Sequence, residues 1–129
     1  METAKILIVE DEAIIALDIQ TTLQDLGYLV PAVVSSGEES IEKASEIHPD
    51  LVLMDIKLSG DMDGISAAEQ IYSRFRIPVV YLTAFPDEKT LEATKGITFF
   101  GYVSKPFDER VLKSAIEQAL GQMDCKFIN

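Results

Sequence analysis

Five short apolar runs alternate with segments of helical periodicity along the chain. Unbroken apolar runs are typical of strands buried on both faces, as in parallel sheets covered by helices. Their alternation with helical segments predicts repeated βα units and therefore an α/β fold. The five strands that we expect are Ala4–Val9, Leu29–Val33, Leu51–Asp55, Val79–Thr83 and Phe99–Val103.

The segments between these runs carry apolar residues at helical spacing. In the first segment, Ile15, Ile19 and Leu23 recur every four residues and define one buried stripe. Leu26 continues this stripe, and Gly27 marks the end of the helix. We expect the other four helices to start at capping or turn-forming residues, namely Ser36, Asp63, Pro86 and Asp108.

The order of the strands follows from the rules for parallel sheets. Right-handed crossovers allow few arrangements, and 2-1-3-4-5 is a common one for five strands. We therefore predict a doubly wound, five-stranded parallel sheet in that order. With 129 residues, the chain is long enough for one such domain. We assign residues 1–121 to the domain and 122–129 to a short C-terminal tail, either extra helix or disordered.

Polar residues stand at the carboxyl ends of four expected strands. Glu10 and Asp11 follow the first strand, and Asp55 ends the third. Thr83 ends the fourth strand, and Lys105 follows the fifth. In the predicted order these ends are neighbours about 4.8 Å apart along one edge, where open α/β sheets bind ligands. Carboxylate oxygens are ligands that Mg²⁺ prefers, so this edge is a candidate Mg²⁺ site.

Charge excludes some classes of partner. The chain has 22 acidic and 11 basic residues, which gives a formal charge of −11. Direct binding to nucleic acid or to anionic membranes depends on clustered lysine and arginine, so we expect neither. The only cysteine, Cys125, excludes an internal disulfide, and no signal peptide or membrane-spanning run is present. These features predict a cytoplasmic location.

Several motifs together resemble the receiver domains of two-component response regulators. The matching segments are Ile-Val-Glu-Asp at 8–11, Leu-Met-Asp at 53–55, Asp-Gly at 63–64, Leu-Thr-Ala at 82–84 and Tyr-Val-Ser-Lys-Pro-Phe at 102–107. Each motif alone is weak, but their order on the expected strands is specific. The resemblance implies a flavodoxin-like (βα)5 fold and a phosphorylation switch.

The resemblance also implies a role for each residue at the strand ends. Asp55 would accept a phosphoryl group. Asp11, Asp55 and the backbone carbonyl of Lys57 would ligate Mg²⁺ directly, with Glu10 acting through water. Thr83 and Lys105 stand at the positions where the family contacts the phosphoryl oxygens. Tyr102 stands at the position of the family's aromatic switch.

The resemblance implies partners as well. A sensor histidine kinase or a phosphotransfer protein would donate the phosphoryl group. The phosphorylated domain would then bind a downstream protein effector or a second phosphorylated copy of itself. The signalling face would comprise the fourth helix, fifth strand and fifth helix. The domain would not be an enzyme acting on other substrates, since it would catalyse only its own phosphorylation, through Asp55, Thr83 and Lys105, and slow self-dephosphorylation.

Two departures and several alternatives remain. Gly64 follows Asp55 by nine positions, where the common family pattern has eight, and Glu10 replaces the first of two usual aspartates. The longer loop affects where Lys57 lies. The chain is either a stand-alone receiver or a module of a larger DNA-binding regulator or hybrid kinase. A haloacid-dehalogenase-type phosphohydrolase is less favoured, because Lys57 stands where that class has an acid/base aspartate. Tyr102 as a plain packing aromatic is the alternative to the switch role.

Overall fold

The structure is a computed structural model that describes residues 3–58, 60–83, 101–105 and 107–128, with 122–128 as backbone. Five strands and four helices lie within these ranges. The strands are β1 (Ile6–Val9), β2 (Val33–Val34), β3 (Leu51–Asp55), β4 (Val79–Thr83) and β5 (Tyr102–Ser104). The helices are α1 (Ala13–Asp25), α2 (Gly37–Ile47), α3 (Gly64–Phe75) and α5 (Glu109–Ile128).

The strands form one parallel sheet in the order β2-β1-β3-β4-β5, which confirms the predicted α/β fold and strand order. The register pairs Val9 of β1 with Met54 of β3. The residues that follow this pair are Glu10 and Asp55, so the register alone brings their side chains to the same place. Farther along the same sheet, Thr83 of β4 pairs with Ser104 of β5, which precedes Lys105.

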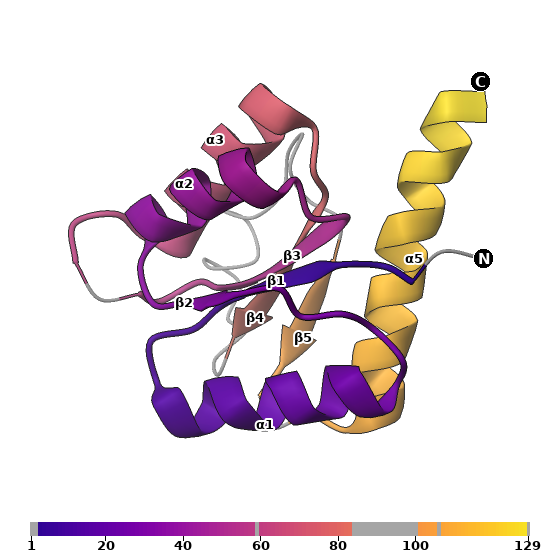
Figure 1. Ribbon diagram of the computed structural model, residues 1–129, viewed down its shortest axis with the longest axis horizontal. Coiled ribbons are helices and arrows are strands. Elements are labelled where there is room, and N and C mark those ends of the chain that lie inside the picture. The colour runs from indigo at the N-terminus through magenta and orange to yellow at the C-terminus, as the bar shows by residue number, and fades with distance from the viewer. Residues whose placement is uncertain (1–2, 59, 84–100, 106, 129) are drawn as a thin grey trace.

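Helices cover both faces of the sheet, with α1 and α5 on one side and α2 and α3 on the other (Figure 1). Alternate residues of each strand face opposite layers, because side chains alternate along a strand. Ile6 and Ile8 of β1 pack in the layer of α1 and α5, whereas Leu7 and Val9 pack in the layer of α2 and α3. Burial on both faces explains why these strands are uninterrupted apolar runs.

Three strands differ from their predicted bounds. The first begins at Ile6 and not at Ala4, since Lys5 forms only an isolated bridge to Leu29. The segment that begins at Leu29 pairs with β1 through an isolated bridge to Lys5, but regular pairing is limited to Val33–Val34. Pro31 lies between these contacts, and proline has no N–H to donate to a ladder. The fifth strand starts at Tyr102, and the earlier part of its predicted range, with the fourth helix expected from Pro86, lies outside the described residues.

The helix ends follow the local sequence signals. The side chains of Ser36 and Asp63 cap α2 and α3 by accepting backbone N–H groups, and Asp108 accepts the N–H of Val111 at the start of α5. Gly27 follows α1 with φ +96°, as a C-terminal glycine should. Helix α5 continues through Ile128, so the backbone of 122–128 is helical, and the domain boundary at residue 121 stays a prediction.

The helices within the described ranges are α1, α2, α3 and α5. None of them combines the length and the apolar character that a membrane-spanning helix needs.

Gly64 fixes the distance between α3 and the end of β3. A Cβ at this position would collide with the carbonyl oxygen of Asp55 and would lie 3.0 Å from the Cα of Ile56. The N–H of Gly64 donates to the carbonyl of Ile56 at 2.9 Å. The loop that leaves Asp55 therefore returns to touch the strand end, and only glycine allows this approach.

We predict that Gly64→Ala destabilises the fold by about 1–3 kcal/mol, because backbone on both sides of the contact must shift. Gly121→Ala is the matched control, since Gly121 lies in α5 with nothing within 4 Å of the added Cβ. The control should gain about 0.5–1 kcal/mol from helix propensity. Urea unfolding measures both changes, and equal stability of the two variants would contradict the close approach.

Candidate functional site

Three buried polar residues mark the carboxyl edge of the sheet. Glu10 is 2% exposed, Asp55 is 6% exposed and Thr83 is 5% exposed. Each stands at or directly after the end of a strand, so the parallel topology gathers them at one edge. Burial of charged groups is costly unless they are paired, so their partners decide what the edge can do.

Lys105 supplies the pairing charge. Its Nζ lies 2.7 Å from Oε1 of Glu10 and 3.2 Å from Oδ2 of Asp55. The lysine side chain is only 14% exposed, and those of Glu10 and Asp55 are 0% and 9% exposed. A short β-ladder holds the lysine in place, because its backbone N–H donates to the carbonyl of Thr83 at 2.8 Å. One ammonium therefore compensates two buried carboxylates.

The compensation is incomplete at Asp55. The pKa of Asp55 is raised from an ordinary 3.8 to about 6, because burial, a hydrogen bond with Glu10 and the negative charge of Glu10 together outweigh the lowering by Lys105. At Lys105, burial acts to lower the pKa, but the hydrogen bond with Glu10 and the two carboxylate charges outweigh it, so the pKa is raised. The edge therefore carries more negative charge than its lysine balances.

The third carboxylate makes the edge suitable for a cation. Carboxylate oxygens of Glu10, Asp11 and Asp55 lie within 4.8 Å of one another. Such a cluster of hard oxygen ligands fits Mg²⁺, which commonly binds through one or two protein carboxylates and completes its shell with water or phosphate oxygens. The raised pKa of Asp55 is a second sign that the site has room for positive charge.

Backbone groups hold two of these carboxylates in position. The N–H of Lys57 donates to Oδ1 of Asp55 at 3.2 Å, and the N–H of Glu12 donates to Oε2 of Glu10 at 3.1 Å. One oxygen of each carboxylate is thus bound to its own loop, and the other is bound to Lys105. Both acidic side chains are oriented before any ligand binds.

Tyr102 lies apart from this cluster. It begins β5 opposite Tyr81, and it is 39% exposed. Its side chain lines a shallow surface hollow together with residues of α5, among them Arg110 and Val111. The structure therefore places Tyr102 beside α5, three positions before Lys105 along the chain.

The sequence analysis gathered Glu10, Asp11, Asp55 and Lys105 correctly at one edge, and the structure brings them into contact. It missed the structural part played by Gly64, which appeared only as one half of the Asp-Gly motif. The sequence did contain a signal for this role, because a glycine next to a functional loop often marks a place where two backbone segments approach closely. It also did not foresee that Lys105 contacts Glu10 more closely than Asp55.

Comparisons with known proteins agree with this geometry. Among curated proteins, the chain is 38% identical over 118 residues to the transcriptional regulatory protein PdtaR of Mycobacterium tuberculosis, and covers 57% of that protein. It is 35% identical over 117 residues to the phyllosphere-induced regulator PhyR of Methylorubrum extorquens, and covers 43% of it. These matches include 92% and 90% of the chain, which spans about half the length of these relatives.

Solved structures share the whole fold. The signal receiver domain of a modulated diguanylate cyclase from Desulfovibrio desulfuricans superimposes with a TM-score of 0.91 at 32% identity, covering 97% of this chain and 99% of that one. The N-terminal domain of a response regulator from Carboxydothermus hydrogenoformans gives 0.86 at 40% identity, covering 95% and 98%. The family model of the response regulator receiver domain matches residues 6–117. This chain therefore belongs to the response regulator receiver domain family.

Proposed function

We propose that the protein is a signalling switch that accepts a phosphoryl group on Asp55 from a partner histidine kinase or phosphotransfer protein. The observation that carries the proposal is the position of Asp55, a buried carboxylate at a strand end within reach of two other carboxylates and one lysine. Membership of the receiver family supports the same role.

Asp55 is suited to act as the nucleophile. Its pKa of about 6 leaves it largely ionised at neutral pH, while burial removes water from its oxygens. An oxygen of Asp55 attacks phosphorus, and the bond from phosphorus to the donor histidine nitrogen breaks with its electron pair on the nitrogen. The Lys57 N–H holds Oδ1, and Lys105 holds Oδ2, so both oxygens are positioned before the donor arrives.

The residues that would hold Mg²⁺ are Asp11 and Asp55, with Glu10 acting through water and the carbonyl of Lys57 as a further ligand. When bound, the ion supplies positive charge that offsets the repulsion between the carboxylates and the incoming phosphoryl group. Asp11 is the most accessible of the three acidic residues. Glu10 and Asp55 are held by Lys105 and by their own loops, so they provide a fixed wall of the site.

Lys105 and Thr83 link phosphorylation to the rest of the molecule. At rest, Lys105 is shared between Glu10 and Asp55. A phosphoryl group on Asp55 offers it new anionic oxygens and weakens its hold on Glu10. Thr83 would donate its hydroxyl to the same group. Lys105 follows β5 and Thr83 ends β4, so a shift of either residue alters the pairing of β4 with β5, the strand that contains Tyr102. A ligand shifts a population only through such differential contacts.

The output of the switch would pass through the face made by the fourth helix, β5 and α5, where Tyr102 lies. The partner there would be a protein effector, or a second phosphorylated copy of the chain. Because the curated relatives are about twice as long, we infer that a receiver of this kind also works as a module of a larger regulator. A phosphohydrolase role is not supported, since Lys57 cannot serve as the acid/base residue.

The acceptor role predicts that a small-molecule acyl phosphate adds one phosphoryl group to the wild type in the presence of Mg²⁺, and none to Asp55→Asn. An amide is a far weaker nucleophile than a carboxylate, which explains the loss. Asp61→Asn is the control, because Asp61 is an exposed acid of the same loop and should label like the wild type. Intact-protein mass spectrometry gives the count, and equal labelling of Asp55→Asn would exclude Asp55 as the acceptor.

The charge excess at the site predicts a pH dependence. Because the pKa of Asp55 is raised in the folded state, its stabilising contribution is complete below about 3.8 and is lost as the pH rises through about 6. In metal-free buffer, the stability of Asp55→Asn relative to the wild type should therefore increase by about 1–3 kcal/mol between pH 4 and pH 7. Its Tm should rise relative to the wild type over the same range.

Mg²⁺ should reverse this trend. At pH 7 the ion should raise the Tm of the wild type and close the gap to Asp55→Asn, because it binds the ionised carboxylates. Asp11→Asn, which removes one charged ligand, should show a smaller rise. Differential scanning calorimetry with chelator or Mg²⁺ measures all three proteins. A Tm gap that stays constant from pH 4 to pH 7 would contradict the charge excess.

The switch role predicts that Lys105→Ala accepts a phosphoryl group yet fails to transmit it to Tyr102. Beryllofluoride, a stable mimic of the acyl phosphate, should shift amide NMR signals from Asp55 through Tyr102 to α5 in the wild type, but only near Asp55 in the variant. Lys113→Ala, at an exposed lysine of α5, should behave like the wild type. A wild type that shows no shift near Tyr102 would end the switch interpretation.

A further inference from the structure

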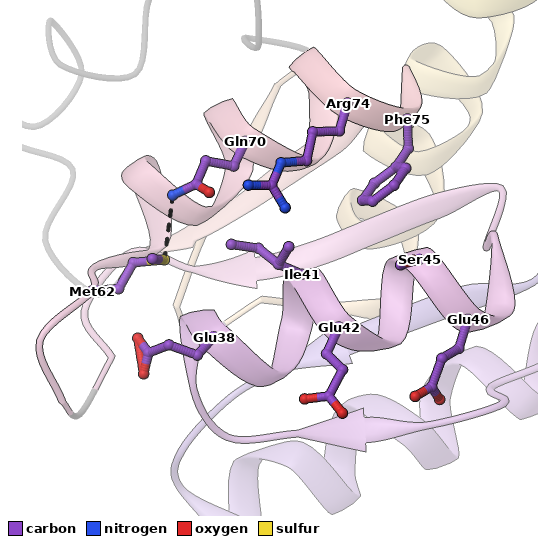
Figure 2. Close-up of a pocket in the computed structure, with 9 residues that line it drawn as sticks. All are labelled: Glu38, Ile41, Glu42, Ser45, Glu46, Met62, Gln70, Arg74 and Phe75. Carbon is purple, nitrogen blue, oxygen red and sulfur yellow. Dashed lines mark hydrogen bonds between the residues drawn. The ribbon is translucent and has the colours of Figure 1, made fainter.

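A groove of about 520 Å³ runs between α2 and α3, and its lining residues do not include the carboxylates and the lysine of the candidate site. The two helices lie side by side over one face of the sheet (Figure 1), and side chains from both line the groove (Figure 2). Nothing in the proposed phosphoryl transfer uses these side chains.

The floor of the groove is apolar. Ile41 of α2 and Phe75 of α3 are partly buried against the core, and Met62 closes one end. Met62 packs on the N-terminus of α2, where a Cβ at Gly37 would lie 3.0 Å from its Cγ. The amide of Gln70 donates to the Met62 sulfur at 3.9 Å (Figure 2). A methionine is an adaptable surface for apolar side chains.

One rim of the groove is acidic. Glu38, Glu42 and Glu46 recur every four residues of α2 and line the groove from one stripe of that helix. Among the described residues, no ion pair involves Glu38 or Glu42, whereas Glu46 pairs with Lys43 at 3.3 Å. Of the described residues that line the groove, Arg74 is the one cation, and its guanidinium is directed from α3 toward α2 (Figure 2).

We propose that this groove docks a basic amphipathic helix of a partner protein. An apolar floor beside an acidic row fits a helix with one apolar and one basic stripe. The three glutamates are separated by about 6 Å along α2, and lysines or arginines four residues apart on a helix have the same separation. A second copy that presents the same groove does not fit, because its own acidic row would face this one.

The position of Met62 connects the groove to the phosphorylation site. The loop that begins after Asp55 reaches Met62 before it enters α3 at Gly64. The same loop carries Lys57, whose N–H holds the Asp55 carboxylate. A helix seated in the groove therefore contacts α2, α3 and the loop of the phosphoryl acceptor, so the partner gains a surface that differs from the face around Tyr102.

The test uses the full chain and a stapled helical peptide of about 15 residues with lysines at every fourth position beside a leucine stripe. A peptide of identical composition in scrambled order is the control. Amide NMR titration should show shifts confined to α2, α3 and Met62 with the ordered peptide, and affinity should fall as salt increases.

Charge variants test whether the acidic row of α2 contributes to binding of the peptide. Glu42→Gln should weaken binding about two- to fivefold, and Arg74→Gln should leave it unchanged or strengthen it. Glu69→Gln removes the same charge from an exposed position of α3 outside the groove and should have no effect. Ser45→Trp fills the groove from the exposed side of α2 and should abolish binding with an unchanged Tm.

Four results would overturn the proposal. They are equal binding of the scrambled peptide, an equal loss for Glu69→Gln and Glu42→Gln, shifts that centre on α5, and retained binding by a folded Ser45→Trp variant. Sedimentation that shows self-association sensitive to Glu42→Gln would assign the groove to a second copy and overturn it as well.

Discussion

The ammonium of Lys105 lies between the buried carboxylates of Glu10 and Asp55, and the charge balance of the whole edge depends on this contact. Buried ion pairs contribute little to stability, because desolvation cancels most of the attraction. The arrangement is therefore better understood as two acids that share one base, and burial together with the neighbouring Glu10 raises the pKa of Asp55. Any added positive charge, or any new anionic partner for Lys105, changes how the lysine is shared.

The fold makes this sharing unavoidable. Parallel strands place all their carboxyl ends at one edge, and the pairing of Val9 with Met54 puts Glu10 beside Asp55. Gly64 then holds α3 against the carbonyl of Asp55, so the acceptor loop is attached to the scaffold at both ends. The bond from the Lys105 N–H to the carbonyl of Thr83 ties the same lysine to the end of β4.

Much of this arrangement could be predicted from the sequence, for identifiable reasons. The apolar runs of β3 and β4 are uninterrupted and end in polar residues, so Leu51–Asp55 and Val79–Thr83 were predicted with their observed bounds. The second strand was wrong in its bounds, because Pro31 limits a ladder that its neighbours would otherwise form. The preference of Lys105 for Glu10 depends on how a long side chain settles between two acids, which spacing along the chain does not encode.

The one-residue difference between Asp55 and Gly64 matters for the same physical reason. A longer loop need not loosen the site, because its ends are fixed by the Lys57 N–H at one side and by Gly64 at the other. Farther along the loop, Gly60 adopts φ +97° and Met62 packs on the N-terminus of α2. Met62 thereby contacts both α2 and α3. Two surfaces of the receiver thus depend on one segment: the Asp55 carboxylate at its start and the apolar end of the groove near its finish.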